Sequence, residues 1–163
     1  MIFFMKYRTG IGQDSHRFLQ DSAEKKCIIA GLEFDDAPGL DADSDGDVVF
    51  HAICNAITSV SHVPILGGIA IDLCKNEGIT DSRIFLNHAL ESLKDQVVEH
   101  VALTIEGKRP RMQKRSLEIR SSVASTMGLN VDQVGITFTS GDGLTSFGKG
   151  EGLMCYCILT TKS

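Results

Sequence analysis

The sequence predicts an α+β fold, in which helices pack on one face of a mixed sheet of four to five strands. Segments with the two-residue apolar period of strands and segments with the three- and four-residue spacing of helices both occur. They do not alternate strictly, as the segments of a doubly wound parallel fold would. The chain of 163 residues suits one domain, residues 1–163, with a core that needs no disulfide staples.

The first predicted element is a strand from residue 7 to residue 16. Because side chains two residues apart point to the same face of a strand, Asp14 and His16 are expected to converge. A second strand is expected at residues 27–34, followed by a loop at residues 35–45 that is rich in Gly, Pro and Asp.

The next element is a helix from Asp47 to about Ser61 with one apolar stripe, and His51 lies off the centre of that stripe. We interpret Ser44 as the helix N-cap, with Asp47 three residues later in a variant of the capping box. The alternative to this capping-box role is that Asp47 orients the imidazole of His51, which lies four residues later on the same helical face.

The rest of the chain continues the mixed pattern of helices and strands. In order, we expect a poorly patterned connection at residues 64–78, a helix from Asp81 or Ser82 to about Leu93, a strand at 97–105, a helix from about Met112 to Met127 ended by Gly128, and strands at 134–139 and 153–161.

Composition narrows the functional classes. A net charge of -5 argues against general nucleic-acid binding. Five cysteines, an odd number without a Cys-x-x-Cys pair, indicate neither a disulfide framework nor a thiolate zinc site and fit a reducing cytoplasm. The apolar run at residues 2–5 is too short for a signal-peptide core or a membrane span, so we expect a soluble cytoplasmic protein without a membrane partner.

Asp14, His16 and His51 are the strongest candidate metal ligands. Two imidazole nitrogens and one carboxylate oxygen suit Zn²⁺ and leave one tetrahedral position open. The alternative is that two of them are partly exposed strand residues and the third lies on a helix surface, with no metal.

Two glycine-rich turns and a basic turn are candidates for phosphate binding. Backbone N–H groups, hydroxyls and a cation occur in the turn at 139–143 and in the stretch at 148–152. The basic residues at 108–111, followed by Lys114 and Arg115, provide charge for a nucleotide phosphate. The alternatives are ordinary turns and a solvated basic face.

Three motifs together resemble the 2-C-methyl-D-erythritol 2,4-cyclodiphosphate synthase family. They are Gly-Ile-Gly-Gln-Asp-Ser-His-Arg-Phe at 10–18, Ser-Asp-Gly-Asp-Val-Val-Phe-His at 44–51 and Gly-Lys-Gly-Glu-Gly at 148–152. Their order and spacing cover nearly the whole chain. The resemblance implies a homotrimer with active sites between neighbouring subunits, and a central sheet-lined channel with an isoprenoid diphosphate as a candidate occupant.

The resemblance also implies a reaction, that of a cyclising phosphorus-oxygen lyase of the methylerythritol phosphate route to isoprenoids. The 2-phosphate of 4-diphosphocytidyl-2-C-methyl-D-erythritol 2-phosphate attacks the β-phosphorus, which gives the 2,4-cyclodiphosphate and CMP. In this family's pattern Asp14, His16 and His51 hold one zinc ion per subunit. A magnesium or manganese ion arrives with the substrate phosphates, and Asp142 stands where the family usually has a Glu for that ion.

The resemblance also implies roles for residues that match the family's functional positions. Ser140 matches a threonine that positions the phosphates, and Lys149 a position that is usually arginine. Asp43 stands where the family usually has a histidine that donates to a phosphate, so we expect it to act through a cation or not at all. The residues implied to touch substrate, including the cytosine-binding turn at 107–111, are Asp14, Ser15, His16, Asp43, Ser44, Gly68, Gly107, Lys108, Arg109, Pro110, Arg111, Thr139, Ser140, Gly141, Asp142 and Lys149.

Two other functions remain open from the sequence. A zinc-dependent phosphoesterase would use the same ligands to activate water. A non-catalytic, metal-stabilised trimer would bind a nucleotide or an isoprenoid diphosphate.

Overall fold

The computed structural model describes residues 5–163 and is built around one four-stranded sheet with the strand order β1-β6-β4-β5. β6 pairs antiparallel with both β1 and β4, whereas β4 and β5 are parallel, so the sheet is mixed. The predicted α+β class with a four-stranded mixed sheet is confirmed. The strands are β1 (Tyr7–Arg17), β4 (Val97–Glu106), β5 (Val134–Thr139) and β6 (Gly152–Lys162).

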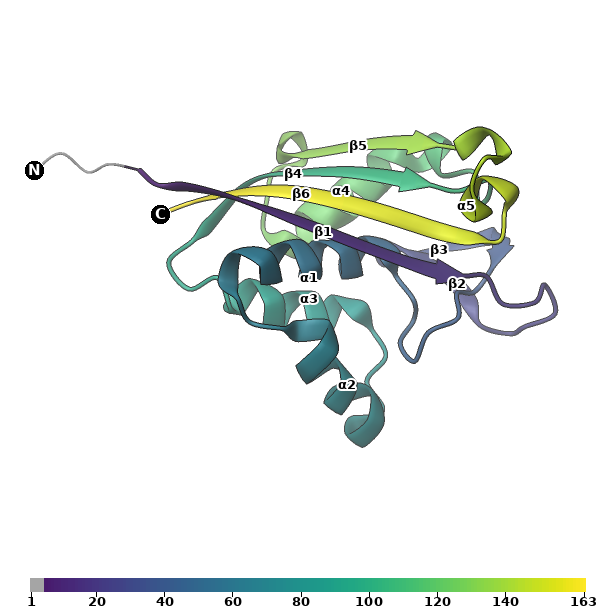
Figure 1. The fold of residues 1–163 in the computed structure, drawn as a ribbon, viewed down its shortest axis with the longest axis horizontal. Coiled ribbons are helices and arrows are strands. Elements are labelled where there is room, and N and C mark those ends of the chain that lie inside the picture. The colour runs from purple at the N-terminus through teal and green to yellow at the C-terminus, as the bar shows by residue number, and fades with distance from the viewer. Residues whose placement is uncertain (1–4) are drawn as a thin grey trace, which may run out of the picture.

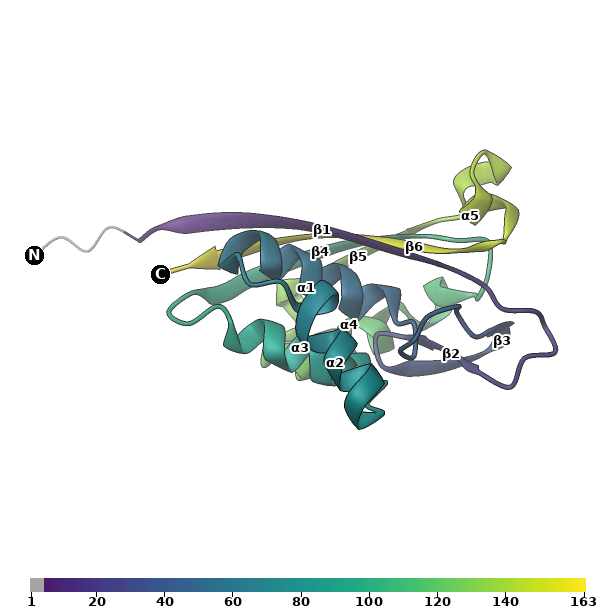
Figure 2. The ribbon, with the colours of Figure 1, turned by 60° about the horizontal axis from the view of Figure 1, so that its bottom comes forward.

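Three helices lie on one side of this sheet, and the other face is bare (Figure 1, Figure 2). They are α1 (Val48–Ser61), α3 (Ser82–Glu91) and α4 (Ser116–Met127), and α3 packs on α1. α1 lies directly on β1, because Gly10 and Gly12 have no side chain there. A Cβ at either position would collide with a backbone carbonyl of α1. This close approach brings the start of α1 near the end of β1.

The strand predicted at 27–34 is in fact a hairpin of β2 (Lys26–Ile29) and β3 (Leu32–Pro38), which forms a separate two-stranded sheet. Ala30 and Gly31 adopt positive φ angles of 53° and 71° and turn the chain in two residues. The prediction missed the turn because alanine rarely takes this conformation. The loop predicted from residue 35 therefore begins only after Pro38.

The connection predicted at 64–78 to be poorly patterned is mostly helical. α2 (Ala70–Asp72) lies between two π-helical turns, Ile65–Ile69 and Leu73–Glu77, and together they form an arm that extends away from the sheet (Figure 1). A π-turn bonds residues five apart, so the buried residues Ile65, Ala70 and Leu73 do not follow the α-helical period. We define residues 65–77 as the helical arm.

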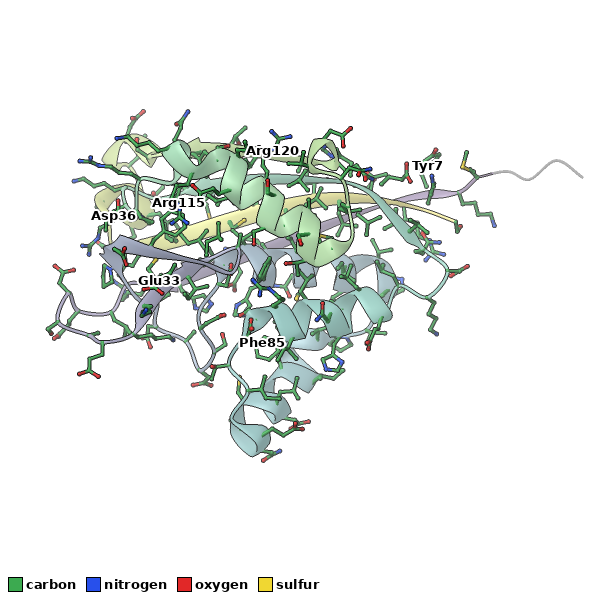
Figure 3. The ribbon with its side chains drawn as sticks, turned by 180° about the vertical axis from the view of Figure 1, so that it is seen from behind. Tyr7, Glu33, Asp36, Phe85, Arg115 and Arg120 are labelled. Atoms are coloured by element: carbon green, nitrogen blue, oxygen red, sulfur yellow. The ribbon has the colours of Figure 1, made fainter. Side chains whose placement is uncertain are left out.

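α4 begins later than predicted, because residues Met112–Arg115 form a 3₁₀ turn before it, and it ends at Gly128 as expected. Two arginines of this region, labelled in Figure 3, fix the helix to its neighbours. Arg115 Nη1 donates to the carbonyl of Glu33 in β3 at 2.6 Å, and Arg120 Nε donates to that of Val134 in β5 at 2.6 Å.

The remaining short elements are 3₁₀ turns at Val131–Gln133 and Gly141–Gly143 and the helix α5 (Ser146–Lys149). No single helix within residues 5–163 is long and apolar enough to span a membrane, and one pair, α1 with the helical arm, reaches that length and composition only together, bent by 114°. Most of the apolar run at residues 2–5 lies outside the described residues.

Candidate active site

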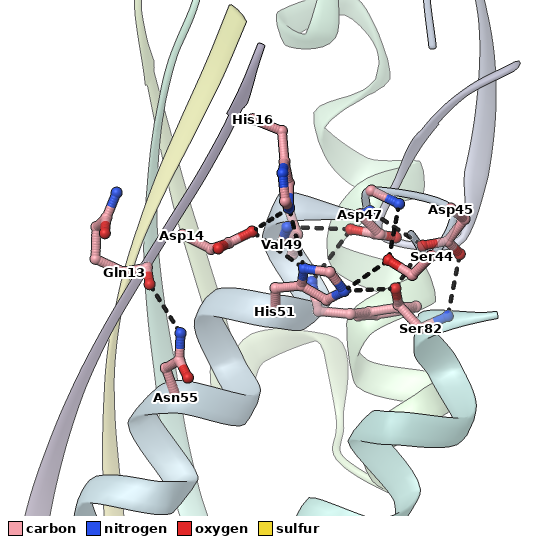
Figure 4. Close-up of polar contacts among 12 residues, drawn as sticks. Gln13, Asp14, His16, Ser44, Asp45, Asp47, Val49, His51, Asn55 and Ser82 are labelled. Atoms are coloured by element: carbon pink, nitrogen blue, oxygen red, sulfur yellow. Dashed lines mark hydrogen bonds and ion pairs between the residues drawn. The ribbon is translucent and has the colours of Figure 1, made fainter. Parts of the chain in front are cut away.

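The three predicted metal ligands meet at the end of β1 (Figure 4). His16 Nε2 lies 2.8 Å from Asp14 Oδ2, and His51 Nδ1 lies 3.1 Å from the same oxygen. The two imidazole nitrogens are 3.2 Å apart. Ligand atoms about 2.0 Å from a tetrahedral zinc ion are separated by roughly 3.3 Å. The donor set and its spacing therefore fit a zinc ion with one position open.

The site favours a cation. Burial acts to raise the pKa of Asp14, but the hydrogen bonds and positive charge of His16 and His51 outweigh it and lower that pKa to about 2. Burial likewise acts to lower the pKa of His16, and the neighbouring Asp14 carboxylate raises it instead. A metal ion would take the place of the protons that the imidazoles share with Asp14, since only a neutral imidazole offers a lone pair.

The other ring nitrogen of His51 is also occupied. His51 Nε2 lies 2.8 Å from Ser82 Oγ, at the start of α3, and 3.3 Å from Ser44 Oγ. Ser82 is in turn bonded to the carboxylate of Asp45, which accepts from the Ser82 amide at 3.1 Å and from its hydroxyl. His51 is buried, although it lies off the centre of the apolar stripe of α1.

The N-cap of α1 is Asp47, and the prediction that Ser44 caps it is wrong. The fully buried Asp47 carboxylate accepts from the amides of Val49 and Phe50 at 3.0 and 3.1 Å. It also accepts from the amides of Ala30 and Gly31 at 2.9 and 2.6 Å. Because its oxygens are used by the backbone, Asp47 caps the helix and does not orient the imidazole of His51.

The loop before α1 carries Asp41, Asp43 and Asp45, and Lys25 binds it from the side. The Lys25 ammonium donates to the carbonyls of Ala42 at 2.8 Å and Ser44 at 2.6 Å, which flank Asp43. Burial lowers the pKa of Lys25, and the three carboxylates act in the opposite direction. Lys25 therefore holds the loop and offsets part of its negative charge.

The metal ligands open into a cavity of about 240 Å³. One wall is polar and includes the exposed Asp43, and the other is apolar and comes from the helical arm. The lining residues are Asp14, His16, Ala42, Asp43, Ser44, His51, Leu66, Ala70, Ile71, Cys74 and Phe85.

A second cavity, of about 270 Å³, lies between the basic turn and the end of β5. The Gly107 amide donates to the Thr139 carbonyl at 3.0 Å, which brings the two turns together. No described residue lines both this cavity and the metal cavity. The lining residues are Gly107, Pro110, Arg111, Met112, Gln113, Lys114, Phe138, Thr139 and Ser140. Phe138 had no predicted role in a site, because its alternation in β5 indicates only a half-buried strand.

Several residues implied to touch substrate lie elsewhere in the single chain. Ser15 points to the opposite face of β1 from Asp14. Arg109 pairs with Asp21 at 3.0 Å and packs over Phe18, outside the second cavity. Gly68 lies on the helical arm and lines neither cavity.

The turn after β5 is exposed and carries the other implied phosphate contacts. Asp142 has a positive φ of 48°, and its Oδ1 is 3.5 Å from Ser140 Oγ. Lys149 is exposed at the end of α5. The Lys108 amide donates to the Phe147 carbonyl at 3.2 Å, so the basic turn and this glycine-rich region are neighbours.

The family model of the YgbB family matches residues 7–162. The chain belongs to the YgbB family. Its curated relatives include the 2-C-methyl-D-erythritol 2,4-cyclodiphosphate synthases of Chlamydia felis, 55% identical over 94% of this chain and 88% of the relative, and of Chlamydia muridarum, 51% identical over 94% and 87%. The resemblance drawn from the sequence motifs is thereby confirmed.

Solved structures share the fold. The bifunctional IspDF from Campylobacter jejuni superposes with a TM-score of 0.87 at 22% identity, over 98% of this chain and 43% of that one. A 2C-methyl-D-erythritol-2,4-cyclodiphosphate synthase in a CDP-bound form superposes with a TM-score of 0.81 at 24% identity, over 94% of this chain and 99% of that one. At these identities, the structures establish the YgbB fold for this chain.

Proposed function

We propose that this member of the YgbB family converts 4-diphosphocytidyl-2-C-methyl-D-erythritol 2-phosphate to 2-C-methyl-D-erythritol 2,4-cyclodiphosphate and CMP. The observation that carries the proposal is the convergence of Asp14, His16 and His51, at ligand spacing, on one cavity of a chain 55% identical to a protein of that name. In the reaction, an oxygen of the 2-phosphate bonds to the β-phosphorus while the β-phosphorus bond to the bridging oxygen breaks. That oxygen leaves with CMP.

The protein contributes chiefly position and charge to this reaction. The substrate phosphates repel one another and the leaving CMP gains negative charge. A zinc ion at the triad would neutralise a phosphate oxygen when bound. The apolar wall that the helical arm presents, including Leu66 and Ile71, excludes water from the same cavity and packs against the carbon chain of the substrate. Water exclusion favours the internal phosphate over hydrolysis.

The second cavity is the proposed nucleotide pocket. Pro110, Met112 and Phe138 give it apolar walls of a size suited to a pyrimidine base. Arg111 and Lys114 place positive charge beside them. The Ser140 hydroxyl at its edge is proposed to position the phosphates, and the exposed Asp142 to ligate magnesium or manganese that arrives with the substrate.

We also propose a homotrimer with active sites between subunits. A single chain presents the metal cavity and the nucleotide pocket without a shared lining residue, so a neighbour would have to complete each site. The bare sheet face exposes Ile11 by 61%, Tyr156 by 44% and Ile158 by 48%, and three such faces would line a central channel. An isoprenoid diphosphate is the proposed channel ligand, and the free thiols fit a cytoplasmic location.

Asp43 is proposed to act through a cation or not at all. It is exposed in the metal cavity, where an unpaired carboxylate would repel phosphate. If Asp43 acts through a metal, Asp43→Ala will raise the metal concentration needed for activity. Unchanged turnover and metal dependence would exclude such a role.

The test of the function combines metal analysis with product analysis. The zinc-loaded protein with magnesium is expected to release CMP and to give a cyclic diphosphate by ³¹P NMR. CMP with an open-chain bisphosphate would instead indicate a phosphoesterase that activates water at the triad. No CMP release with both metals present would indicate a non-catalytic binding protein.

A further inference from the structure

Both ring nitrogens of the buried His51 have fixed neighbours. Nδ1 faces Asp14 and His16 at 3.1 and 3.2 Å, where the metal would bind. Nε2 faces Ser82 Oγ at 2.8 Å. His51 is 6% exposed and Ser82 is 0% exposed, so the partner of Nε2 is set by the protein. What occupies Nε2 therefore decides what Nδ1 offers to a metal.

Ser82 has one hydroxyl proton and two possible acceptors. Its oxygen contacts His51 Nε2 and Asp45 Oδ1 (Figure 4). An ionised carboxylate only accepts hydrogen bonds, so the hydroxyl proton must go to Asp45. The Ser82 oxygen then accepts from His51, which requires the imidazole proton to be on Nε2. When a metal ion replaces the proton that Nδ1 shares with Asp14, this arrangement leaves the lone pair of Nδ1 directed at the metal site.

Asp45 is itself held in the position that this arrangement needs. Its Oδ2 accepts from the Ser82 amide at 3.1 Å, and its Oδ1 accepts from the Asp47 amide at 3.1 Å. The Asp45 amide donates to the Thr80 carbonyl at 2.8 Å. The Asp45 carboxylate thus joins the start of α3 to the start of α1. Its orientation is fixed by these two backbone amides.

We infer that Ser82 and Asp45 are positioning residues that fix His51 as its Nε2–H tautomer and so prepare Nδ1 to bind a divalent metal. The inference rests on the proposed metal site. Neither residue lines the metal cavity or the nucleotide pocket, so both act through the imidazole. Partners of this kind typically contribute 10- to 100-fold to metal affinity, about 1.4 to 2.7 kcal/mol.

Ser44 provides a matched control. It is also a buried serine whose Oγ faces Nε2, but at 3.3 Å, and its contacts include no carboxylate. The Gly46 amide donates to it at 3.2 Å. Removing the Ser44 hydroxyl leaves the Asp45–Ser82–His51 chain intact.

The experiment measures zinc affinity of the metal-free full chain by competition with a chelating dye, without substrate. Ser82→Ala is expected to weaken zinc binding by about 10- to 100-fold, and Ser44→Ala by less than about threefold. Wild-type affinity in Ser82→Ala would overturn the inference. If Ser82→Ala does not fold, Asp45→Asn carries the same test, because it keeps the hydroxyl and removes the anion that directs it.

A second readout is independent of turnover and of folding in the variants. ¹⁵N NMR of the zinc-loaded wild-type protein is expected to show the remaining proton of His51 on Nε2; a proton on Nδ1 would overturn the inference. A failure of this inference can also be distinguished from a failure of the proposed function. A protein with these zinc affinities and this tautomer that releases no CMP would refute the activity and leave the positioning role intact.

Discussion

At the residue scale, the candidate metal centre joins a local pair to a distant partner. Asp14 and His16 share a strand face, whereas His51 arrives from α1 and makes the set complete. The anionic ligand adds charge attraction that the imidazoles lack, which is consistent with the low pKa of Asp14. Each of the three side chains is therefore expected to be needed for metal binding.

His51→Gln tests this expectation against His88→Gln, the same change at a partly exposed residue of α3 that lies outside the metal cavity. An amide is a poor zinc ligand, so His51→Gln is expected to lose bound zinc and at least about 100-fold in CMP release. His88→Gln should keep both. Mass spectrometry measures the zinc content of both variants, and a CMP-release assay measures their activity. Equal zinc content in the two proteins would contradict the assignment of His51 as a metal ligand.

Lys25 gives a second prediction at this scale. Lys25→Met removes two charge-assisted hydrogen bonds to the loop and leaves its carboxylates without a compensating cation. Loss of one such bond costs about 1.5 kcal/mol or more, so KM for the phosphorylated substrate is expected to rise about tenfold. Adding Asp43→Asn to Lys25→Met should recover part of that loss, because one repulsive charge is gone. A KM unchanged by Lys25→Met would argue against this role.

At the scale of elements, the start of α1 is where the fold and the site meet. Asp47 caps the helix and also binds the turn between β2 and β3. The same residue therefore fixes where α1 begins, and with it the position of His51. It also fixes how the hairpin lies against α1. The sequence pattern placed Asp47 only in a capping box behind Ser44, and the two hairpin amides follow only from the turn at Ala30 and Gly31, which the strand pattern conceals.

Asp47→Ala is expected to lower the free energy of unfolding by about 3 kcal/mol, because a lost cap costs about 1 kcal/mol and buried amides left unpaired cost more. Asp81→Ala is the control. Asp81 caps α3 through one exposed bond to the Arg83 amide, so it should cost only about 0.5 to 1 kcal/mol. Urea unfolding of the metal-free proteins compares them, and similar losses would show that the hairpin bonds add nothing.

At the scale of the whole molecule, the bare sheet face is an apolar surface that a single chain leaves exposed to solvent. Its apolar residues are exposed although the opposite face of the same strands is buried. The proposed trimer requires that burial of this face against other copies also bring a metal cavity near the nucleotide pocket of a neighbour.

Ile158→Glu is expected to dissociate the proposed trimer, because it places a charge in the centre of the face that the subunits would bury. Leu117→Glu is the matched control, since Leu117 is 64% exposed on α4, away from this face. Sedimentation equilibrium measures the mass of each protein. Dissociation should also abolish CMP release, and a wild-type protein that is monomeric would refute the trimer.

The sequence by itself determined the features that depend on local periodicity and on motifs. The two-residue strand period places Asp14 and His16 together, the helical period locates α1, α3 and α4, and the three motifs indicate the family. It also determined the end of α4 at Gly128, whose positive φ of 67° suits glycine. These outcomes follow from interactions between residues that are close along the chain.

Only the tertiary structure decided which distant groups meet. Ser82 reads in the sequence as the start of a helix, and its contact with His51, 31 residues away, exists because α3 packs beside α1. The π-turns of the helical arm and the turn at Ala30 depend on packing that outweighs local preference. Folding pairs buried polar groups wherever the chain brings them together, so the partners of His51 could not be read from spacing.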